Sequence, residues 1–252
     1  MQRADLSDIS STRFDLAVIG GGINGVAIAR DAAMRGMSVA LVERDDLASG
    51  TSAWSSRLIH GGLRYLEHRE FGLVRESLRE RERLLGNAPH LVQPLGMLVP
   101  IYSGNKRGPK LIRAGMVLYD VLSYDKSLPT HDMLSRAEVL DRHPDMSPEG
   151  LRGGAYYYDA QVTFAERLVV EQAISAWEHG AQIATGCTVV GIRTEGAVVR
   201  GLTVRDADSG EEIPIDARVV VNVAGPWVDQ VLTGAPAGSV SQRLIGGTKG
   251  SH

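Results

Sequence analysis

The sequence predicts an α/β fold built on a parallel sheet, with a small antiparallel β excursion. Two observations predict it. A strand, a helix and a second strand follow one another within about 30 residues, between positions 14 and 43, which is the length of a right-handed βαβ unit. Short β runs separated by turn residues then occupy positions 181–224 and end in a very apolar strand at 218–223.

The first strand is FDLAVI at 14–19, an apolar run bounded by polar and glycine residues, as in a strand buried on both faces. A helix follows over INGVAIARDAAMRG and is expected to end at Gly36. The helical spacing places three apolar residues near one face: Ile23, Ala27 and Met34. SVALVE, at 38–43, is the second strand.

Residues 44–65 keep neither helical nor strand periodicity and predict a long shaped loop with one helical turn. A helix is expected over 70–87, with Val74, Leu78 and Leu85 on its apolar side and alternating Arg and Glu forming a solvated face. Two more helices are predicted, at 109–124 and at 162–180.

The composition excludes several classes of protein. The chain has 252 residues, 43% apolar and 23% charged, so it can bury a globular core. Its net charge of −3 provides no positive field for nucleic acid. Cys187 is the only cysteine, which favours a reducing compartment and a buried, small apolar role. The polar start of the chain lacks a secretory signal, and no apolar run reaches the roughly 18 residues of a membrane span.

Three glycines, Gly20, Gly22 and Gly25, form G-x-G-x-x-G between the first strand and the helix. In this context the glycines permit a tight turn, close approach of the backbone to a pyrophosphate, and close packing of helix on strand. The helix N-terminus attracts anions. Glu43 ends the second strand, where a carboxylate accepts ribose hydroxyls. The pattern predicts a dinucleotide site but leaves NAD and FAD open.

The next segment, SGTSAWSSRLIHGG, favours FAD over a nicotinamide cofactor. Hydroxyls can bond phosphates and the flavin rim, and Gly61 and Gly62 let the main chain lie against a ring. The hydroxyl residues are Thr51, Ser52, Ser55 and Ser56.

Four strings in this order resemble the flavin-dependent glycerol-3-phosphate dehydrogenases, among the D-amino-acid-oxidase-like flavoproteins: IGGGINGVAIARDAAMRG, TSAWSSRLIHGGLRYLE, VNVAGPWVD and KGSH. The resemblance runs from Phe14 to His252. It implies a Rossmann-like FAD-binding domain of the glutathione-reductase type. It also implies oxidation of sn-glycerol 3-phosphate to dihydroxyacetone phosphate, with electrons passed to a quinone or another acceptor.

The resemblance also implies roles for single residues. It places Arg64 and Tyr65 at the substrate, where a guanidinium holds a phosphate through paired hydrogen bonds. His252, whose imidazole accepts a proton near neutral pH, is implied to be the general base. The implied FAD contacts are Gly20, Gly22, Gly25, Glu43, Thr51, Ser52, Ser56, Val189, Asn222, Ala224, Gly225 and Trp227. No metal is expected, because His68, His90, His131, His143 and His179 show no ligand spacing.

The expected organisation is a loose leader at 1–13, then an FAD-binding domain at 14–252 with part of a substrate domain inserted at about 90–160. Family members continue beyond the position of His252, so the rest of the substrate domain is expected to be missing. Three other functions stay open: a non-catalytic FAD-binding fragment, an oxidase that uses oxygen, and a nicotinamide dehydrogenase.

The expected location is the cytoplasm, with peripheral contact at the cytoplasmic face of the inner membrane as a further hypothesis. Four basic residues, Lys106, Arg107, Lys110 and Arg113, precede the apolar stretch MVLYDVLSY, a pattern that suits anionic lipid. A plain core helix with a solvated basic end is the alternative. Assembly into a homo-oligomer is left open.

Overall fold

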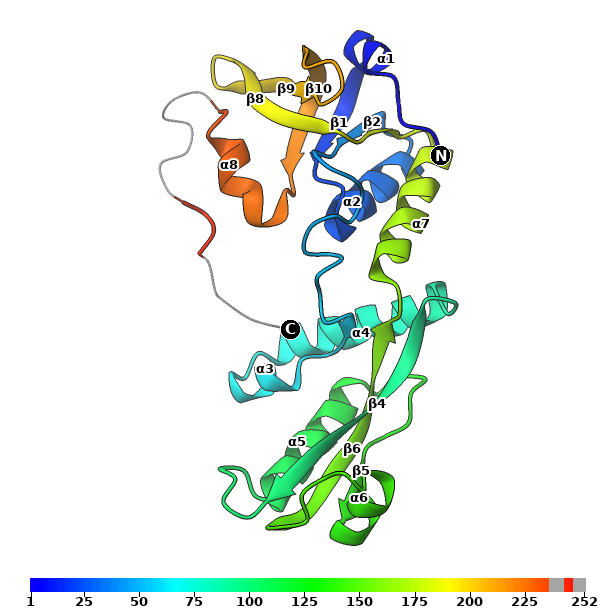
Figure 1. Cartoon of the computed structure of the whole chain (residues 1–252), viewed down its shortest axis with the longest axis vertical. Helices are drawn as coiled ribbons and strands as arrows, with labels where there is room; N and C mark the ends of the chain where they lie inside the picture. The colour runs from blue at the N-terminus through cyan, green and yellow to red at the C-terminus, as the bar shows by residue number, and fades with distance from the viewer. Residues whose placement is uncertain (236–242, 247–252) are drawn as a thin grey trace. The chain divides into compact units, whose positions relative to one another are not determined.

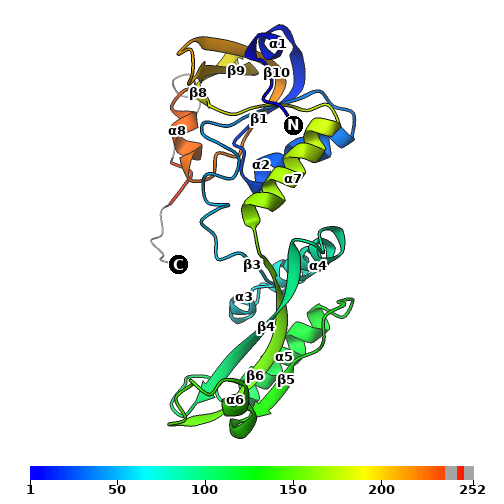
Figure 2. The same cartoon turned by 45° about the vertical axis from the view of Figure 1, so that its right-hand side comes forward.

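The computed structural model describes residues 1–235 and 243–246 (Figures 1 and 2). The chain divides into two compact units. The first unit comprises Met1–Ser56 and Phe164–His252, and the inserted unit comprises Arg57–Thr163. The insertion therefore begins at Arg57, earlier than the expected boundary near residue 90, because the second half of the predicted loop belongs to it.

In its described part, the first unit has a six-stranded sheet in the order β7-β2-β1-β10-β9-β8. Four strands run parallel to one another: β1 (Arg13–Ile19), β2 (Val39–Val42), β7 (Gln182–Ala184) and β10 (Glu212–Asn222). β8 (Cys187–Glu195) and β9 (Val198–Asp206) form the predicted antiparallel excursion. The two predicted runs at 211–223 are one strand, β10, whose first half pairs antiparallel with β9 and whose second half pairs parallel with β1.

Two helices, α2 (Ile23–Met34) and α7 (Ala165–Glu178), pack with the parallel strands in one apolar core. The buried face of α2 consists of Gly25, Val26, Ala29, Ala32 and Ala33. This corrects the predicted face, since Met34 is 51% exposed. The small residues of α2 meet Ala173 and Ala176 of α7, so short side chains let these helices approach closely.

The N-terminal segment is not a loose leader. It contains α1 (Leu6–Ser11), capped by the carboxylate of Asp5, which accepts the N–H of Ser7 at 2.8 Å. Leu6 and Ile9 are buried in a core that includes Cys187. The Cys187 side chain is buried as predicted, and burial raises the pKa of its thiol.

The last helical elements among the described residues of the first unit are a short 3₁₀ helix, η1 (Gly225–Trp227), and α8 (Val228–Leu232). Both follow β10 directly, so the apolar strand predicted at 218–223 carries the chain to the edge of the sheet where β1 also ends.

The inserted unit, all of which is described, has a sheet in the order β3-β6-β4 with β5 also paired to β6. The strands are β3 (Leu58–Ile59), β4 (Val92–Tyr102), β5 (Asp132–Ser135) and β6 (Leu151–Val162). The helices are α3 (Leu63–Glu67), α4 (Phe71–Asn87), α5 (Pro109–Leu122) and α6 (Arg136–Arg142). The predicted helices at 70–87 and 109–124 are confirmed. The long strands β4 and β6 were not predicted, because Pro94 and Pro100 in β4 and two glycines in β6 interrupt their pattern.

The solvated face predicted for the helix at 70–87 is wrong at one position. Arg81 is 0% exposed, although the neighbouring Glu80 and Arg83 are exposed and pair with each other. It follows Val74 and Leu78 at positions i+7 and i+3, so it lies on the apolar side of α4.

Candidate functional site

The predicted glycine motif forms a tight turn between β1 and α2. Gly20 has φ +113°, and a Cβ there would lie 2.7 Å from the carbonyl oxygen of Val223. A Cβ on Gly25 would lie 1.8 Å from the carbonyl oxygen of Gly20. Gly22 is the N-cap of α2 and offers no side-chain cap. The start of α2 is therefore a close-packed, backbone-lined surface whose positive end is not neutralised by its own cap.

Glu43 and Ser52 both contact this turn. The Glu43 carboxylate accepts the N–H of Gly21 at 2.6 Å and that of Asp45 at 2.9 Å. The Ser52 hydroxyl oxygen accepts the N–H of Ile23 at 3.0 Å, at the first turn of α2. In this role the hydroxyl proton of Ser52 stays available to donate to an anion.

The end of β10 lies beside the same turn, because Asn222 is in register with Ile19 of β1. The side chain of Asn222 donates to the carbonyl of Val228 at 3.1 Å and accepts the N–H of Ala224 at 3.2 Å, which holds the Asn222–Gly225 corner. Trp227 then packs over the segment after β2. The Arg44 guanidinium lies 4.8 Å from its ring centroid, and a Cβ on Gly50 would lie 3.0 Å from its ring.

The structure thus brings together most of the predicted cofactor residues of the first unit, from segments about 200 positions apart. Two of them, Thr51 and Ser56, are exposed in the turn-rich segment that also holds Ser52. Val189 lies in β8, where it pairs with Val204 of β9 and packs against the core that includes Cys187.

Four further predicted residues lie in the inserted unit. Gly61 is buried, and Gly62, with φ +69°, is the N-cap of α3. α3 carries Arg64, which is exposed, and Tyr65, which is 42% exposed. The predicted base, His252, lies outside the described residues.

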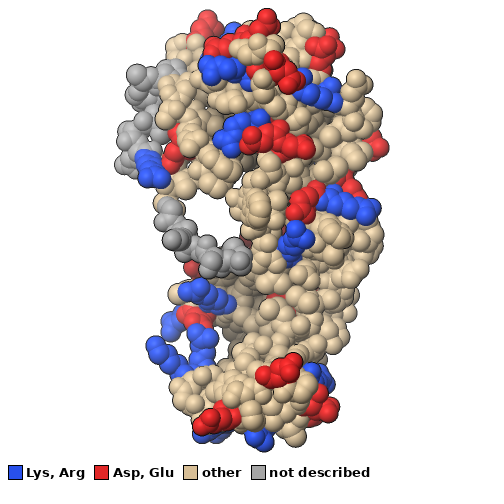
Figure 3. Space-filling model, viewed as in Figure 1, with Lys and Arg blue, Asp and Glu red and all other residues tan. Residues whose placement is uncertain are grey.

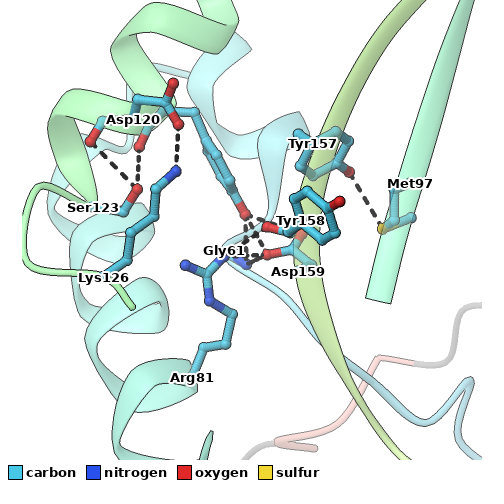
Figure 4. Close-up of polar contacts among 10 residues, drawn as sticks. Gly61, Arg81, Met97, Asp120, Ser123, Lys126, Tyr157, Tyr158 and Asp159 are labelled. Atoms are coloured by element: carbon cyan, nitrogen blue, oxygen red, sulfur yellow. Dashed lines mark hydrogen bonds and ion pairs between the residues drawn. The ribbon is translucent and has the colours of Figure 1, made fainter. Parts of the chain in front are cut away.

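Sequence reasoning missed a buried polar cluster in the inserted unit (Figure 4). It consists of Arg81 of α4, Tyr119 of α5 and Asp159 of β6, hereafter the Tyr–Asp–Arg cluster. Arg81 points its guanidinium at Asp159, with a 2.5 Å contact, and the Tyr119 hydroxyl lies 2.8 Å from the same carboxylate oxygen. The position of Arg81 on the apolar side of α4 was the signal that could have revealed it.

Burial sets the protonation of the tyrosines near this cluster. Burial, and then the charge of Asp159, raise the pKa of Tyr119 far above its usual range. The same causes raise the pKa of Tyr157 to about 12. Both phenols therefore keep their protons at neutral pH, and Tyr119 acts as a donor to the carboxylate.

The inserted unit has a second cluster of charges. Burial works to raise the pKa of Asp120, but hydrogen bonds from Lys126 and His131 outweigh it and lower that pKa. His131 Nδ1 lies 2.6 Å from Asp120. Among the described residues, no group of three or more His, Cys, Asp or Glu side chains is placed to hold a metal ion.

No helix in the described part of the chain is both long and apolar enough to cross a bilayer.

Comparison with known protein families identifies the family of this chain. The family model described as DAO, FAD dependent oxidoreductase, matches residues 15–252. The chain belongs to the DAO family. FAD is the cofactor of this family, which confirms the cofactor predicted from the sequence.

Two individual relatives show which members of the DAO family this chain is similar to. A glycerol-3-phosphate dehydrogenase of Synechocystis sp. is 51% identical over 253 residues, covering 97% of this chain and 46% of that protein. A D-erythritol 1-phosphate dehydrogenase of Brucella abortus is 47% identical over 94% of this chain and 46% of its own length. The chain spans about half the length of these curated relatives.

A solved structure supports the fold. The glycerol-3-phosphate dehydrogenase from Bacillus halodurans, complexed with FAD, has 30% sequence identity and a TM-score of 0.70, covering 91% of this chain and 38% of that one. The predicted Rossmann-like FAD-binding fold and the predicted family are therefore confirmed.

Proposed function

We propose that this chain is the FAD-binding part of an enzyme that oxidises sn-glycerol 3-phosphate to dihydroxyacetone phosphate. The observation that carries the proposal is the glycine turn, closed by Glu43 and by the end of β10, in a chain 51% identical to a glycerol-3-phosphate dehydrogenase. A turn of this kind binds the diphosphate of a dinucleotide at a helix N-terminus.

The residues present fit FAD. Gly20 and Gly25 have no room for a side chain, so the backbone can approach a pyrophosphate. Glu43 would accept the ribose hydroxyls, and Ser52 would donate to a phosphate. Asn222, Ala224, Gly225 and Trp227 would border the cofactor where β10 ends beside β1. The further proposed contacts are Thr51, Ser56, Gly61, Gly62 and Val189.

When bound, FAD supplies the acceptor for a hydride, at its N5 atom. The chain's own residues would prepare the alcohol. Arg64 would hold the substrate phosphate through paired hydrogen bonds, with Tyr65 beside it. His252 would take the hydroxyl proton as C2 gives up its hydride, a task that suits an imidazole near neutral pH. Loss of one hydride and one proton would convert the alcohol into a ketone.

The reduced flavin must pass two electrons on, and we propose a quinone as the acceptor. Oxygen is the alternative, and it would yield hydrogen peroxide. A non-catalytic FAD-binding fragment is a second alternative. The nicotinamide dehydrogenase considered from the motif alone has no support from the family match.

The relative from Brucella abortus adds a substrate alternative. The compound in its name, D-erythritol 1-phosphate, is also a phosphorylated polyol. An arginine that binds the phosphate would serve both substrates. Other residues of the site would therefore have to distinguish the three-carbon polyol from the four-carbon one.

We expect the visible spectrum of the purified, FAD-loaded chain to bleach when glycerol 3-phosphate is added without oxygen. Erythritol phosphate, glycerol and NADH are the comparison additions. Flavin absorbance that no polyol phosphate changes would contradict catalysis by this chain and would favour the non-catalytic fragment. A colourless chain that takes up no FAD would contradict the whole proposal. Adding air and assaying peroxide, or adding a soluble quinone, then distinguishes the two acceptors.

We also propose peripheral contact with an anionic membrane through α5. The outer side of this helix exposes two apolar residues that lie one turn apart: Val117 is 48% exposed and Val121 is 61% exposed. The basic residues Lys106, Arg107, Lys110 and Arg113 lie at its N-terminal end. Figure 3 shows Lys and Arg side chains gathered along one edge of this unit. Apolar side chains beside basic ones suit the interface of an anionic bilayer.

We expect the chain to float with phosphatidylglycerol-containing vesicles at low salt but not with phosphatidylcholine vesicles. Each basic residue near such a surface contributes about 1 kcal/mol, so the double change Lys110→Glu and Arg113→Glu should weaken binding by tenfold or more. Arg136→Glu, on α6, is the matched control and should leave binding unchanged. Equal flotation with both kinds of vesicle would remove the hypothesis.

A further inference from the structure

The three residues of the Tyr–Asp–Arg cluster come from three different elements and are almost fully buried. Arg81 is 0% exposed, Asp159 1% and Tyr119 2%. The Tyr119 hydroxyl lies 2.8 and 3.0 Å from the two oxygens of Asp159, and Arg81 also donates to the carbonyl of Tyr158 at 3.3 Å. The surrounding core is apolar and includes Val74, Leu78, Met116 and Tyr157.

A contribution to folding stability does not by itself explain why the Arg81–Asp159 ion pair is buried in this core. Removing two charges from water is expensive, and well-packed apolar residues of similar size often stabilise a protein as well as a buried ion pair does. The cluster is also incompletely satisfied, because Arg81 Nε and Nη2 have no hydrogen-bond partner within the described part of the chain. A buried polar group of this kind fixes one geometry, since any other arrangement leaves charges unpaired.

What the cluster holds is the main chain of the segment between β3 and α3. The Gly61 N–H donates to the Tyr119 hydroxyl oxygen at 3.0 Å and lies 3.4 Å from Asp159 Oδ1. A Cβ on Gly61 would lie 2.4 Å from Leu78 and 2.6 Å from the Tyr119 hydroxyl. Gly61 is thus pressed against α4 and α5 and bonded there through its amide (Figure 4).

The residues that follow depend on this anchor. Gly62 turns the chain into α3 with φ +69°, and a Cβ at Gly62 would lie 2.4 Å from the ring of Tyr65. α3 has only five residues, and none of them is fully buried. Its partly buried Leu63 and Leu66 pack against the core, so few contacts of its own hold this helix. Arg64 and Tyr65 follow the anchored Gly61 by three and four residues.

We propose that the Tyr–Asp–Arg cluster is a positioning device for substrate binding. It fixes the amide of Gly61 and thereby the direction in which Arg64 and Tyr65 project, and so it sets the affinity for the phosphorylated polyol without touching it. This inference rests on the proposed function for the roles of Arg64 and Tyr65. The geometry of the cluster and of Gly61 stands independently of those roles.

The chain offers a matched pair of variants. Tyr119→Phe removes the hydroxyl that accepts the Gly61 amide and donates to Asp159. Tyr157→Phe removes the hydroxyl of the neighbouring tyrosine, whose ring centroid lies 5.8 Å from that of Tyr119. This hydroxyl contacts the sulfur of Met97. Both variants keep the ring and the packing, so they differ in the contact to the segment at 61–65.

Amide hydrogen exchange tests the anchor without any need for turnover. In the unaltered chain we expect the Gly61 amide to exchange slowly, although it lies outside any helix or strand. Tyr119→Phe should speed this exchange about tenfold, the effect of losing one net hydrogen bond, while Tyr157→Phe should not. Rapid exchange of Gly61 in the unaltered chain, or equal acceleration in both variants, would overturn the anchor.

Substrate titration tests the consequence. In the FAD-loaded chain, Tyr119→Phe should raise the dissociation constant of glycerol 3-phosphate about tenfold and leave that of FAD unchanged, while Tyr157→Phe changes neither. In turnover, KM should rise more than kcat falls. Faster exchange with unchanged substrate affinity would overturn the positioning role. If the unaltered chain binds FAD but no polyol phosphate, the proposed function has failed, whereas the exchange comparison still decides whether the cluster fixes the segment.

Discussion

Replacing Gly25 by alanine is expected to weaken FAD binding strongly, although the change adds a single methyl group. That methyl would lie 1.8 Å from the carbonyl oxygen of Gly20 and 3.4 Å from the side chain of Val223, so either α2 or the turn at Gly20 has to move. Movement of the turn separates the backbone that would receive the pyrophosphate from Glu43. We expect the affinity for FAD to fall about 100-fold or more, which corresponds to about 2.7 kcal/mol. Flavin retained on gel filtration and a fluorescence titration with FAD measure it.

Gly86→Ala is the matched control for this prediction. Gly86 lies inside α4, and a Cβ there would meet no atom within 4 Å. Alanine should therefore leave FAD affinity unchanged and stabilise the helix by about 0.4–1 kcal/mol, because it lowers the entropy of the unfolded chain. Flavin affinity within twofold of the unaltered chain for Gly25→Ala would show that the close packing of α2 on the turn does not shape the site.

Replacing Arg81 by methionine is expected to destabilise the inserted unit by about 3–5 kcal/mol, which would unfold many small units of this size. Methionine fills most of the space of the arginine but leaves the carboxylate of Asp159 buried without its cation. Urea unfolding followed by circular dichroism, with hydrogen exchange of β6 amides to assign the transition to this unit, measures the effect.

Arg83→Met is the control, two residues away on the same helix. Arg83 is 58% exposed and pairs with Glu80 at the surface. An exposed ion pair contributes about 0–1 kcal/mol, so this change should be nearly silent. The double variant Arg81→Met with Asp159→Asn should recover part of the loss, because neither buried charge then remains. Similar unfolding midpoints for Arg81→Met and Arg83→Met would show that the buried pair has no special energetic role.

The first βαβ unit shows how far local sequence reaches. The strands at 14–19 and 38–43, the helix between them and the turn at Gly20–Gly25 were all predicted, because hydrophobic period and glycine spacing are properties of consecutive residues. The wrong face of α2 was a failure of the same reasoning. Its buried side is made of alanines, which carry little hydrophobic signal, whereas Met34 has a strong signal and is exposed.

The inserted unit shows what local patterns miss. β4 and β6 pair with each other over their whole length, yet prolines and glycines break the alternation that would reveal them. Arginine usually lies at the surface. The energetic cost of burying Arg81 is offset because Asp159, 78 positions later in the chain, pairs with it.

By itself, then, the amino-acid sequence determined the class of fold, the dinucleotide turn and the family, because each of these is written in short, contiguous motifs. Only the tertiary structure decided that Asn222 lies level with Ile19, that Trp227 covers the segment after β2, and that Tyr119 and Asp159 receive the amide of Gly61. The physical reason is that periodicity reports which side of an element is apolar, whereas the partner of that side depends on where the chain returns. Contacts between residues 40 to 200 positions apart arise from that return, and no local pattern encodes them.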